Sequence, residues 1–246
     1  MKKYFWLTIL LIFGTLVFAE SRAVALNDNS NSIILTWSSS SFTPAWYPLK
    51  PLPSAGSQIT VSASPENLIK EKELKLKPRD LTYRWSLNYR VQQSVSGKGK
   101  QDLNFVAAGT RGTDIPVKVE IRDDTGLILG EKSLKITLGE PTVQIHALTP
   151  RQSLGPALKS NLTVSPGEKV SLIAVPYFFN IDDASQIYFS WTVNDEPLLD
   201  FPERPDILEI KTDPETPFET VYNTISRLQS KISKEFASSH LIITVK

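Results

Sequence analysis

The sequence feature that most constrains the fold is an internal repeat with a unit of about 105 residues. Residues 54–65 (SAGSQITVSASP) match residues 165–176 (SPGEKVSLIAVP), which lie 111 residues later. Two further matches follow in the same order: residues 83–88 with 189–194, and residues 136–138 with 243–245. Three ordered matches at similar spacing indicate two copies of one folding unit.

Each unit carries the alternation of apolar and polar residues that is typical of β-strands. Tyr83, Trp85 and Leu87 alternate with polar residues, and the pattern recurs around Trp191. Period two places one face of an antiparallel strand on a core and the other in water. Because turn signals such as residues 123–126 (DDTG) separate the runs, we expect about seven short strands per unit. Trp85 and Trp191 are the predicted structural core residues.

We therefore expect an all-β chain with two tandem Ig-like β-sandwich domains, preceded by an N-terminal signal. The domains are predicted at residues 32–140 and 141–246. The boundary follows from Gly139-Glu-Pro141, since Pro141 has no N–H to donate to a strand ladder.

One segment gives conflicting signals. Its apolar residues recur at helical spacing: Val221, Ile225, Leu228, Ile232 and Phe236. The repeat instead places a strand near residues 223–230. We follow the repeat and allow a helical turn around residues 231–237.

Residues 1–25 are predicted to be an export signal. Lys2 and Lys3 precede an apolar run over residues 4–18, and small-residue sites for cleavage end at Ala19 and Ala25. The run is short for a hydrocarbon core of about 30 Å, which favours a cleaved signal peptide over an uncleaved anchor. We expect the protein outside the cytoplasm, at the cell surface or secreted, with membrane contact only through this segment if it stays uncleaved.

The composition excludes several classes of function. The chain has no cysteine and two histidines, which removes thiolate sites and most histidine-based sites. A formal net charge of +1 provides no field for nucleic acid. A Gly-x-Ser-x-Gly motif is absent. The acidic pairs Asp123-Asp124 and Asp182-Asp183 lack the spacing of a calcium loop. We expect no enzyme activity, no cofactor and no metal site.

The most unusual stretch is residues 42–53, where prolines flank Trp46 and Tyr47. Two interpretations are open. The rings form an exposed ridge for a partner, which makes Trp46 and Tyr47 candidate partner-binding residues. Alternatively, both rings pack over an edge of the sandwich and cover it.

Residues 83–88 (YRWSLN), together with 117–121 (VKVEI) and 123–126, resemble bacterial tandem Ig-like domains, including those of the polycystic-kidney-disease type. Residues 35–38 (LTWS) and 176–180 (PYFFN) are similar to uncharacterised exported proteins of candidate-phylum bacteria. The residues after Trp85 depart from the usual turn of the polycystic type. The resemblance implies fold and location, and it assigns no binding residues.

These observations predict an exported, non-enzymatic envelope or cell-surface protein with a role in binding or assembly. Its expected partner is another surface protein or a wall polymer. One alternative is a carbohydrate-binding or enzyme-accessory module that stacks sugars on Trp46 and Tyr47. A mechanical spacer is the other alternative.

Overall fold

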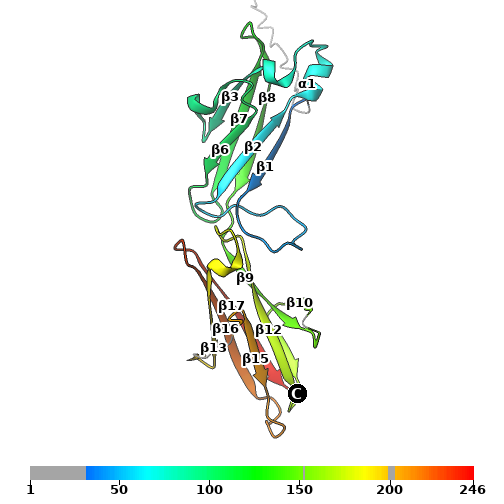
Figure 1. The fold of residues 1–246 in the computed structure, drawn as a ribbon, viewed down its shortest axis with the longest axis vertical. Helices are drawn as coiled ribbons and strands as arrows, with labels where there is room; N and C mark the ends of the chain where they lie inside the picture. Colours follow the sequence, from blue (N-terminus) through cyan, green and yellow to red (C-terminus); the bar gives the residue numbers. More distant parts are fainter. Residues whose placement is uncertain (1–31, 152, 199–202) are drawn as a thin grey trace, which may run out of the picture.

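The structure is a computed structural model that describes residues 32–151, 153–198 and 203–246. Two β-sandwiches lie end to end along the long axis of the molecule (Figure 1). The expected export signal, residues 1–25, lies outside the described residues. None of the helices in the described part of the chain has the length and apolar character of a membrane span.

The first sandwich pairs β1-β2-β6 in one sheet and β4-β3-β7-β8 in the other, with β5 added to β3. Its helix α1 (Glu66–Glu71) and the 3-10 turns Pro78–Asp80 and Gln93–Val95 lie in connections. The strands are β1 (Ile34–Ser39), β2 (Gln58–Ser64), β3 (Thr82–Leu87), β4 (Arg90–Val91), β5 (Gly97–Lys98), β6 (Asp102–Val106), β7 (Asp114–Arg122) and β8 (Ile128–Thr137).

The second sandwich pairs β10-β9-β12-β15 in one sheet and β11-β17-β16-β13-β14 in the other. A 3-10 turn at Ala184–Gln186 precedes β13. Strand β11 runs parallel to β17, whereas the other pairs are antiparallel. The strands are β9 (Thr142–Leu148), β10 (Leu154–Leu158), β11 (Asn161–Val164), β12 (Lys169–Tyr177), β13 (Ile187–Val193), β14 (Glu196–Pro197), β15 (Ile207–Lys211), β16 (Val221–Ser230) and β17 (Phe236–Val245).

Each sandwich has a hydrophobic core of its own. One core is drawn from residues 33–138 and the other mainly from residues 143–245. Trp85 is 0% exposed in the first core and Trp191 is 1% exposed in the second. The indole Nε1 of Trp85 donates to the Lys100 carbonyl (2.9 Å), and that of Trp191 donates to the Pro205 carbonyl (3.2 Å). Both rings are therefore buried without leaving the indole N–H unpaired.

The segment with conflicting signals is a strand. β16 extends over Val221–Ser230, as the repeat indicates. The helical turn allowed around residues 231–237 is wrong, because a bend precedes Phe236, where β17 begins. The alternation of β16 was hidden because most of its buried residues are polar: Thr224, Ser226, Leu228 and Ser230.

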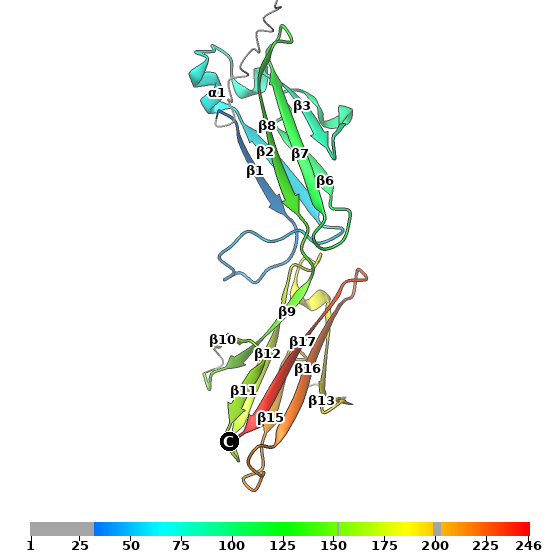
Figure 2. The ribbon, with the colours of Figure 1, turned by 180° about the vertical axis from the view of Figure 1, so that it is seen from behind.

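The long connection between β1 and β2, residues 40–57, is called the junction loop below. It leaves the first sandwich and reaches the level at which the two sandwiches meet (Figure 2). In the second sandwich the corresponding connection, between β9 and β12, instead contains β10 and β11. The two copies of the repeat therefore differ at the junction loop.

Candidate functional site

The junction loop is joined to the second sandwich through its backbone. The Phe42 N–H donates to the Phe179 carbonyl (2.7 Å), and the Phe178 N–H donates to the Phe42 carbonyl (2.6 Å). Phe178 has φ +61°, a left-handed conformation that is unfavourable for a bulky residue. Such a conformation persists only where the surroundings fix it, and the two bonds to Phe42 do so.

Aromatic side chains pack beside these hydrogen bonds. The Tyr47 ring lies edge-on to Tyr177, with ring centroids 5.6 Å apart, and edge-on to Phe178 at 5.7 Å. Edge-to-face packing of this kind is favourable. Tyr177 is only 4% exposed, and this burial raises the pKa of its phenol.

The junction loop also covers the outer face of β12. Leu172 and Ala174 of β12 belong to the second core. Val175 and Tyr177 do not, yet each is only 4% exposed. Because side chains alternate between the faces of a strand, these two residues point away from the core. Their burial shows that β12 is covered on both faces at this end.

A carboxylate connects the two sandwiches. Glu235, just before β17, accepts a hydrogen bond from the Ser54 hydroxyl of the junction loop (2.8 Å). Its other oxygen accepts from the backbone N–H of Asn180 (2.7 Å) in the second sandwich. The Asn180 side chain in turn donates to the Gly56 carbonyl (3.2 Å). Hydrogen bonds to an ionised acceptor are stronger than neutral ones, so this network fixes the loop in place.

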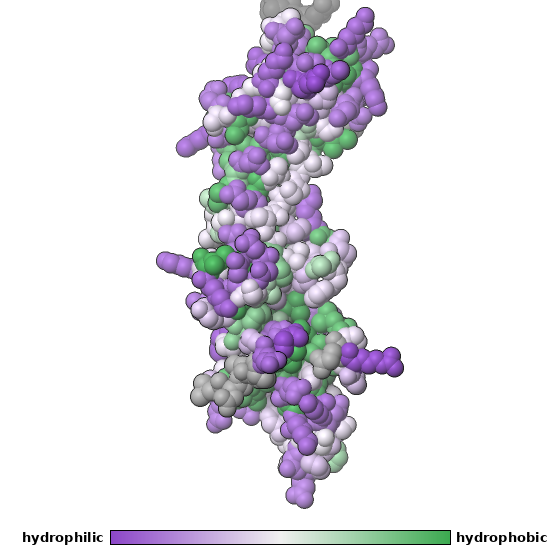
Figure 3. Space-filling view, viewed as in Figure 1, coloured by the Kyte–Doolittle hydropathy of each residue, from purple (hydrophilic) through white to green (hydrophobic). Residues whose placement is uncertain are grey.

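A groove of about 620 Å³ opens beside these contacts, between the junction loop and the second sandwich. From the first sandwich it is lined by Phe42, Pro44 and Trp46. Facing them are Val175 and Pro176 of β12, Phe189 of β13, and Pro205, which precedes β15. We call this cavity the junction groove. Hydrophobic surface is exposed on the lower sandwich in Figure 3.

The charged residues at the rim of the groove are largely paired. Arg204 donates to both carboxylate oxygens of Asp206, from Nε at 2.9 Å and Nη2 at 2.6 Å. The Lys231 ammonium donates to the Ser185 carbonyl (2.6 Å) and lies 5.0 Å from the centre of the Tyr188 ring. Since these charges are already engaged, the groove presents mainly apolar and aromatic walls to a ligand.

The structure separates the two candidate binding residues. Trp46 lines the junction groove and is 56% exposed. Tyr47 is half-buried in its contacts with Tyr177 and Phe178. Of the pair, Trp46 is the ring that remains accessible to a partner.

Sequence reasoning missed the groove walls of the second sandwich and the bridging carboxylate of Glu235. A signal for the first was present. Residues 172–179 (LIAVPYFF) form an unbroken apolar run, and such a run is typical of a strand that is covered on both faces. No comparable signal marks Glu235, because its partners Ser54 and Asn180 are distant in sequence.

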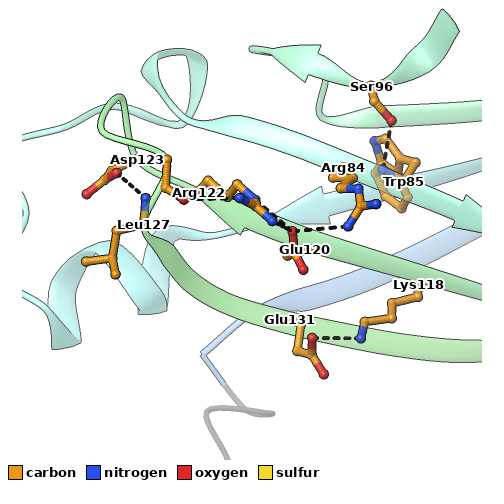
Figure 4. A network of polar contacts seen from close by, with 10 residues as sticks. Arg84, Trp85, Ser96, Lys118, Glu120, Arg122, Asp123, Leu127 and Glu131 are labelled. Atoms are coloured by element: carbon orange, nitrogen blue, oxygen red, sulfur yellow. Dashed lines mark hydrogen bonds and ion pairs between the residues drawn. The ribbon is translucent and has the colours of Figure 1, made fainter. Parts of the chain in front are cut away.

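The acidic pairs serve local turns. Asp123 accepts from the Thr125 N–H (2.9 Å) and from the Leu127 N–H (2.9 Å, Figure 4). The hydrogen bond from the Thr125 hydroxyl is the main cause of its lowered pKa. Asp183 accepts from the Ser185 N–H at 2.7 Å. Among the described residues, no group of three or more histidine or acidic side chains is arranged to hold a metal ion.

The two histidines lie on different sheets of the second sandwich. His146 is buried in β9, with Nδ1 2.9 Å from the Gly155 carbonyl. His240 belongs to β17 and is paired in register with Ile225. The structure thus brings no histidine into the junction groove.

No protein-family model matches the chain, and no curated protein matches it. Among solved structures, it is similar to the three N-terminal domains of the Hoc outer capsid protein of bacteriophage RB49, with 15% identity and a TM-score of 0.43. That match covers 87% of this chain and 59% of the capsid-protein chain, so this chain spans about three fifths of that structure's length.

Two further similarities involve other tandem β domains. The fibronectin(III)-like modules of Clostridium thermocellum CbhA match at 15% identity and a TM-score of 0.28, over 87% of this chain and 94% of that one. The titin Ig tandem domains match at 9% identity and a TM-score of 0.27, over 80% and 91%. The β-sandwich architecture of this chain rests on its own sheet pairings.

Proposed function

We propose that this chain is an exported, non-enzymatic binding protein of the cell envelope, and that the junction groove is where a partner protein docks. The observation that carries the proposal is the groove itself, because it combines an exposed tryptophan with apolar walls from both sandwiches. Concave apolar sites with few polar groups are the usual form of a binding pocket. Exposed tryptophans are enriched among the residues that dominate binding energy.

The surroundings of the groove support the proposal. One wall comes from the junction loop, which is held by the Phe42 backbone bonds and by Glu235. A groove whose walls are fixed before binding loses little conformational freedom when a ligand enters. A partner that inserts an apolar side chain beside Trp46 therefore gains the full benefit of burying that surface.

Binding is tested by capture from envelope extract with three forms of the protein: wild type, Trp46→Ala and Phe218→Ala. Phe218 is a matched control, since it is an aromatic residue with 74% exposure outside the groove lining. We expect one partner protein to bind wild type and Phe218→Ala equally and to bind Trp46→Ala at least about tenfold more weakly, as for a binding residue worth about 1.4 kcal/mol. Equal capture by all three forms would contradict a role for the groove, and retention on wall polymer would identify a different partner class.

The export part of the proposal rests on residues 1–25 and needs its own test. In a cell fractionation, we expect mature protein that starts near Glu20 or Leu26 to appear outside the cytoplasm. Full-length protein confined to the cytosol would refute it.

A spacer role is the second candidate, and the junction contacts favour it. End-to-end sandwiches joined by backbone bonds, aromatic packing and Glu235 make a rod of defined length (Figure 1). If capture finds no partner of the groove, this role becomes the better explanation.

A further inference from the structure

Strand β8 ends its sheet in the part of the chain that the structure describes. The order of that sheet is β4-β3-β7-β8, so β8 has β7 on one side only. It runs lengthwise along the first sandwich (Figure 2). An edge of ten residues is a ready template for another strand.

The second copy of the repeat covers only the end of the corresponding edge, at the places of residues 135–138. There, β11 pairs with β17 in parallel over Ile242–Val245. The Lys246 N–H donates to the Val164 carbonyl (2.9 Å), and in the first sandwich the Gly139 N–H donates to the Pro53 carbonyl at the same distance. Gly139 lies 107 residues before Lys246, so Pro53 stands at the place of Val164.

Proline explains why the first sandwich does not complete this ladder. Ser160 and Val164 both accept hydrogen bonds from the β17 side, so alternate residues of β11, including Leu162, point toward β17. The residues in the places of Leu162 and Val164 are Pro51 and Pro53. Neither proline has an N–H. The two hydrogen bonds that these positions would donate to β8 therefore cannot form, and the ladder is not completed.

The backbone groups left at the edge can be assigned. The Leu138 N–H donates to Thr113 on the β7 side, whereas the Gly139 N–H points away from β7 toward Pro53. Because these directions alternate along a strand, the odd-numbered residues of β8 direct their N–H and C=O groups outward. Three successive odd-numbered residues are Glu131, Ser133 and Lys135, and their side chains are exposed on the outer face of the sheet.

These three residues are self-complementary. If a second β8 lies antiparallel with a two-fold axis at Ser133, Glu131 of each copy falls opposite Lys135 of the other. The pairs 131–135, 133–133 and 135–131 are all formed by outward-directed residues, which gives about six inter-strand hydrogen bonds at two per pair. Opposite charges on directly facing residues add to the stability of such a pair.

The charges of β7 extend the pattern. Within one copy, Lys118 pairs with Glu131 at 2.7 Å (Figure 4), and Lys135 pairs with Asp114 at 2.9 Å. Joining two copies at Ser133 therefore produces a row of alternating sign: Lys118, Glu131, then Lys135 and Asp114 of the second copy. The row is repeated on the other side of the axis.

We propose that two copies of this chain associate through β8, paired antiparallel about Ser133, so that their sheets join into one. The two-fold axis is then perpendicular to the joined sheet. The second sandwiches of the two copies therefore extend in opposite directions. Each dimer displays two junction grooves, which allows bivalent capture of a partner.

The test exploits the absence of cysteine from the chain. In the full chain expressed in cells, Ser133→Cys places one thiol of each copy at the axis. The Cα atoms of a hydrogen-bonded antiparallel pair are about 5.5 Å apart, within the range that a disulfide spans. We expect a disulfide-linked dimer as the main species on a non-reducing gel.

Ser238→Cys is the matched control. Ser238 is an exposed residue on the corresponding strand of the second sandwich, β17, and it aligns with Glu131 in the repeat. We expect this variant to remain mostly monomeric. If Ser133→Cys yields no more linked dimer than Ser238→Cys, the proposal is wrong.

The register is tested by charge exchange in the Ser133→Cys background. Glu131→Lys places two lysines opposite each other, and Lys135→Glu places two glutamates opposite each other, so each variant alone should cross-link less. Co-expression of the two, one carrying a size tag, should restore cross-linking in the mixed dimer, because each Lys then faces a Glu. Absence of this recovery would overturn the proposed pairing about Ser133.

Discussion

Replacing Trp85 by alanine should unfold the first sandwich selectively. The ring is 0% exposed, and its N–H donates to the Lys100 carbonyl. Large-to-small changes of a buried aromatic residue typically cost about 3–5 kcal/mol, and the unpaired carbonyl adds to that cost. A domain has only about 5–15 kcal/mol of stability in total, so the change removes a large part of it.

Chemical unfolding followed by circular dichroism and by amide hydrogen exchange measures this effect. In Trp85→Ala, we expect protection to fall in residues 34–137 and to persist in residues 161–245. Trp191→Ala should show the reverse. Trp46→Ala is the control, since a residue that is 56% exposed has little core packing to lose. Loss of protection in both halves of Trp85→Ala would refute the idea that each sandwich is stabilised by its own core.

Three further predictions concern the boundary, the junction and a turn. A chain that ends at Glu140 should unfold cooperatively by itself; a broad, non-cooperative transition would mean that the first sandwich depends on the second. Glu235→Ala leaves the Asn180 N–H without its acceptor and should lower the free energy of unfolding by about 1–3 kcal/mol, whereas Glu203→Ala, an exposed rim residue, should change little in calorimetry. The hydrogen bond from the Thr125 hydroxyl lowers the pKa of Asp123, so the stability it contributes is present above the unfolded-state pKa and is lost as pH falls through the folded-state pKa. Asp123→Asn should reduce this acid sensitivity in thermal melts, and an unchanged pH profile would contradict the assignment.

The fold followed from the sequence because most inward positions are apolar. Alternation around Trp85 and Trp191 marked the central strands, and the repeat transferred that assignment between the two halves. In β16 the alternation failed as a signal, since Thr224 and Ser226 are buried at inward positions. There the repeat was the better guide, because it reflects the whole sandwich and not one strand.

The site was harder to predict than the fold. Composition singled out Trp46 and Tyr47, but their different surroundings depend on residues about 130 positions away, such as Tyr177 and Phe178. Local sequence contains no information on which loop meets which strand end. The apolar run over residues 172–179 indicated that something covers β12, without identifying the junction loop as the cover.

The junction loop also has a consequence for the order of events during synthesis. The N-terminal half of a chain emerges first and folds as a unit before the rest is available. Until residues 175–180 and Glu235 have followed, Phe42 and Tyr47 have none of the contacts that bury them in the finished protein. The nascent first sandwich therefore exposes these aromatic side chains until the second half is complete. Completion of the second half is thus the step that protects the chain from aggregation.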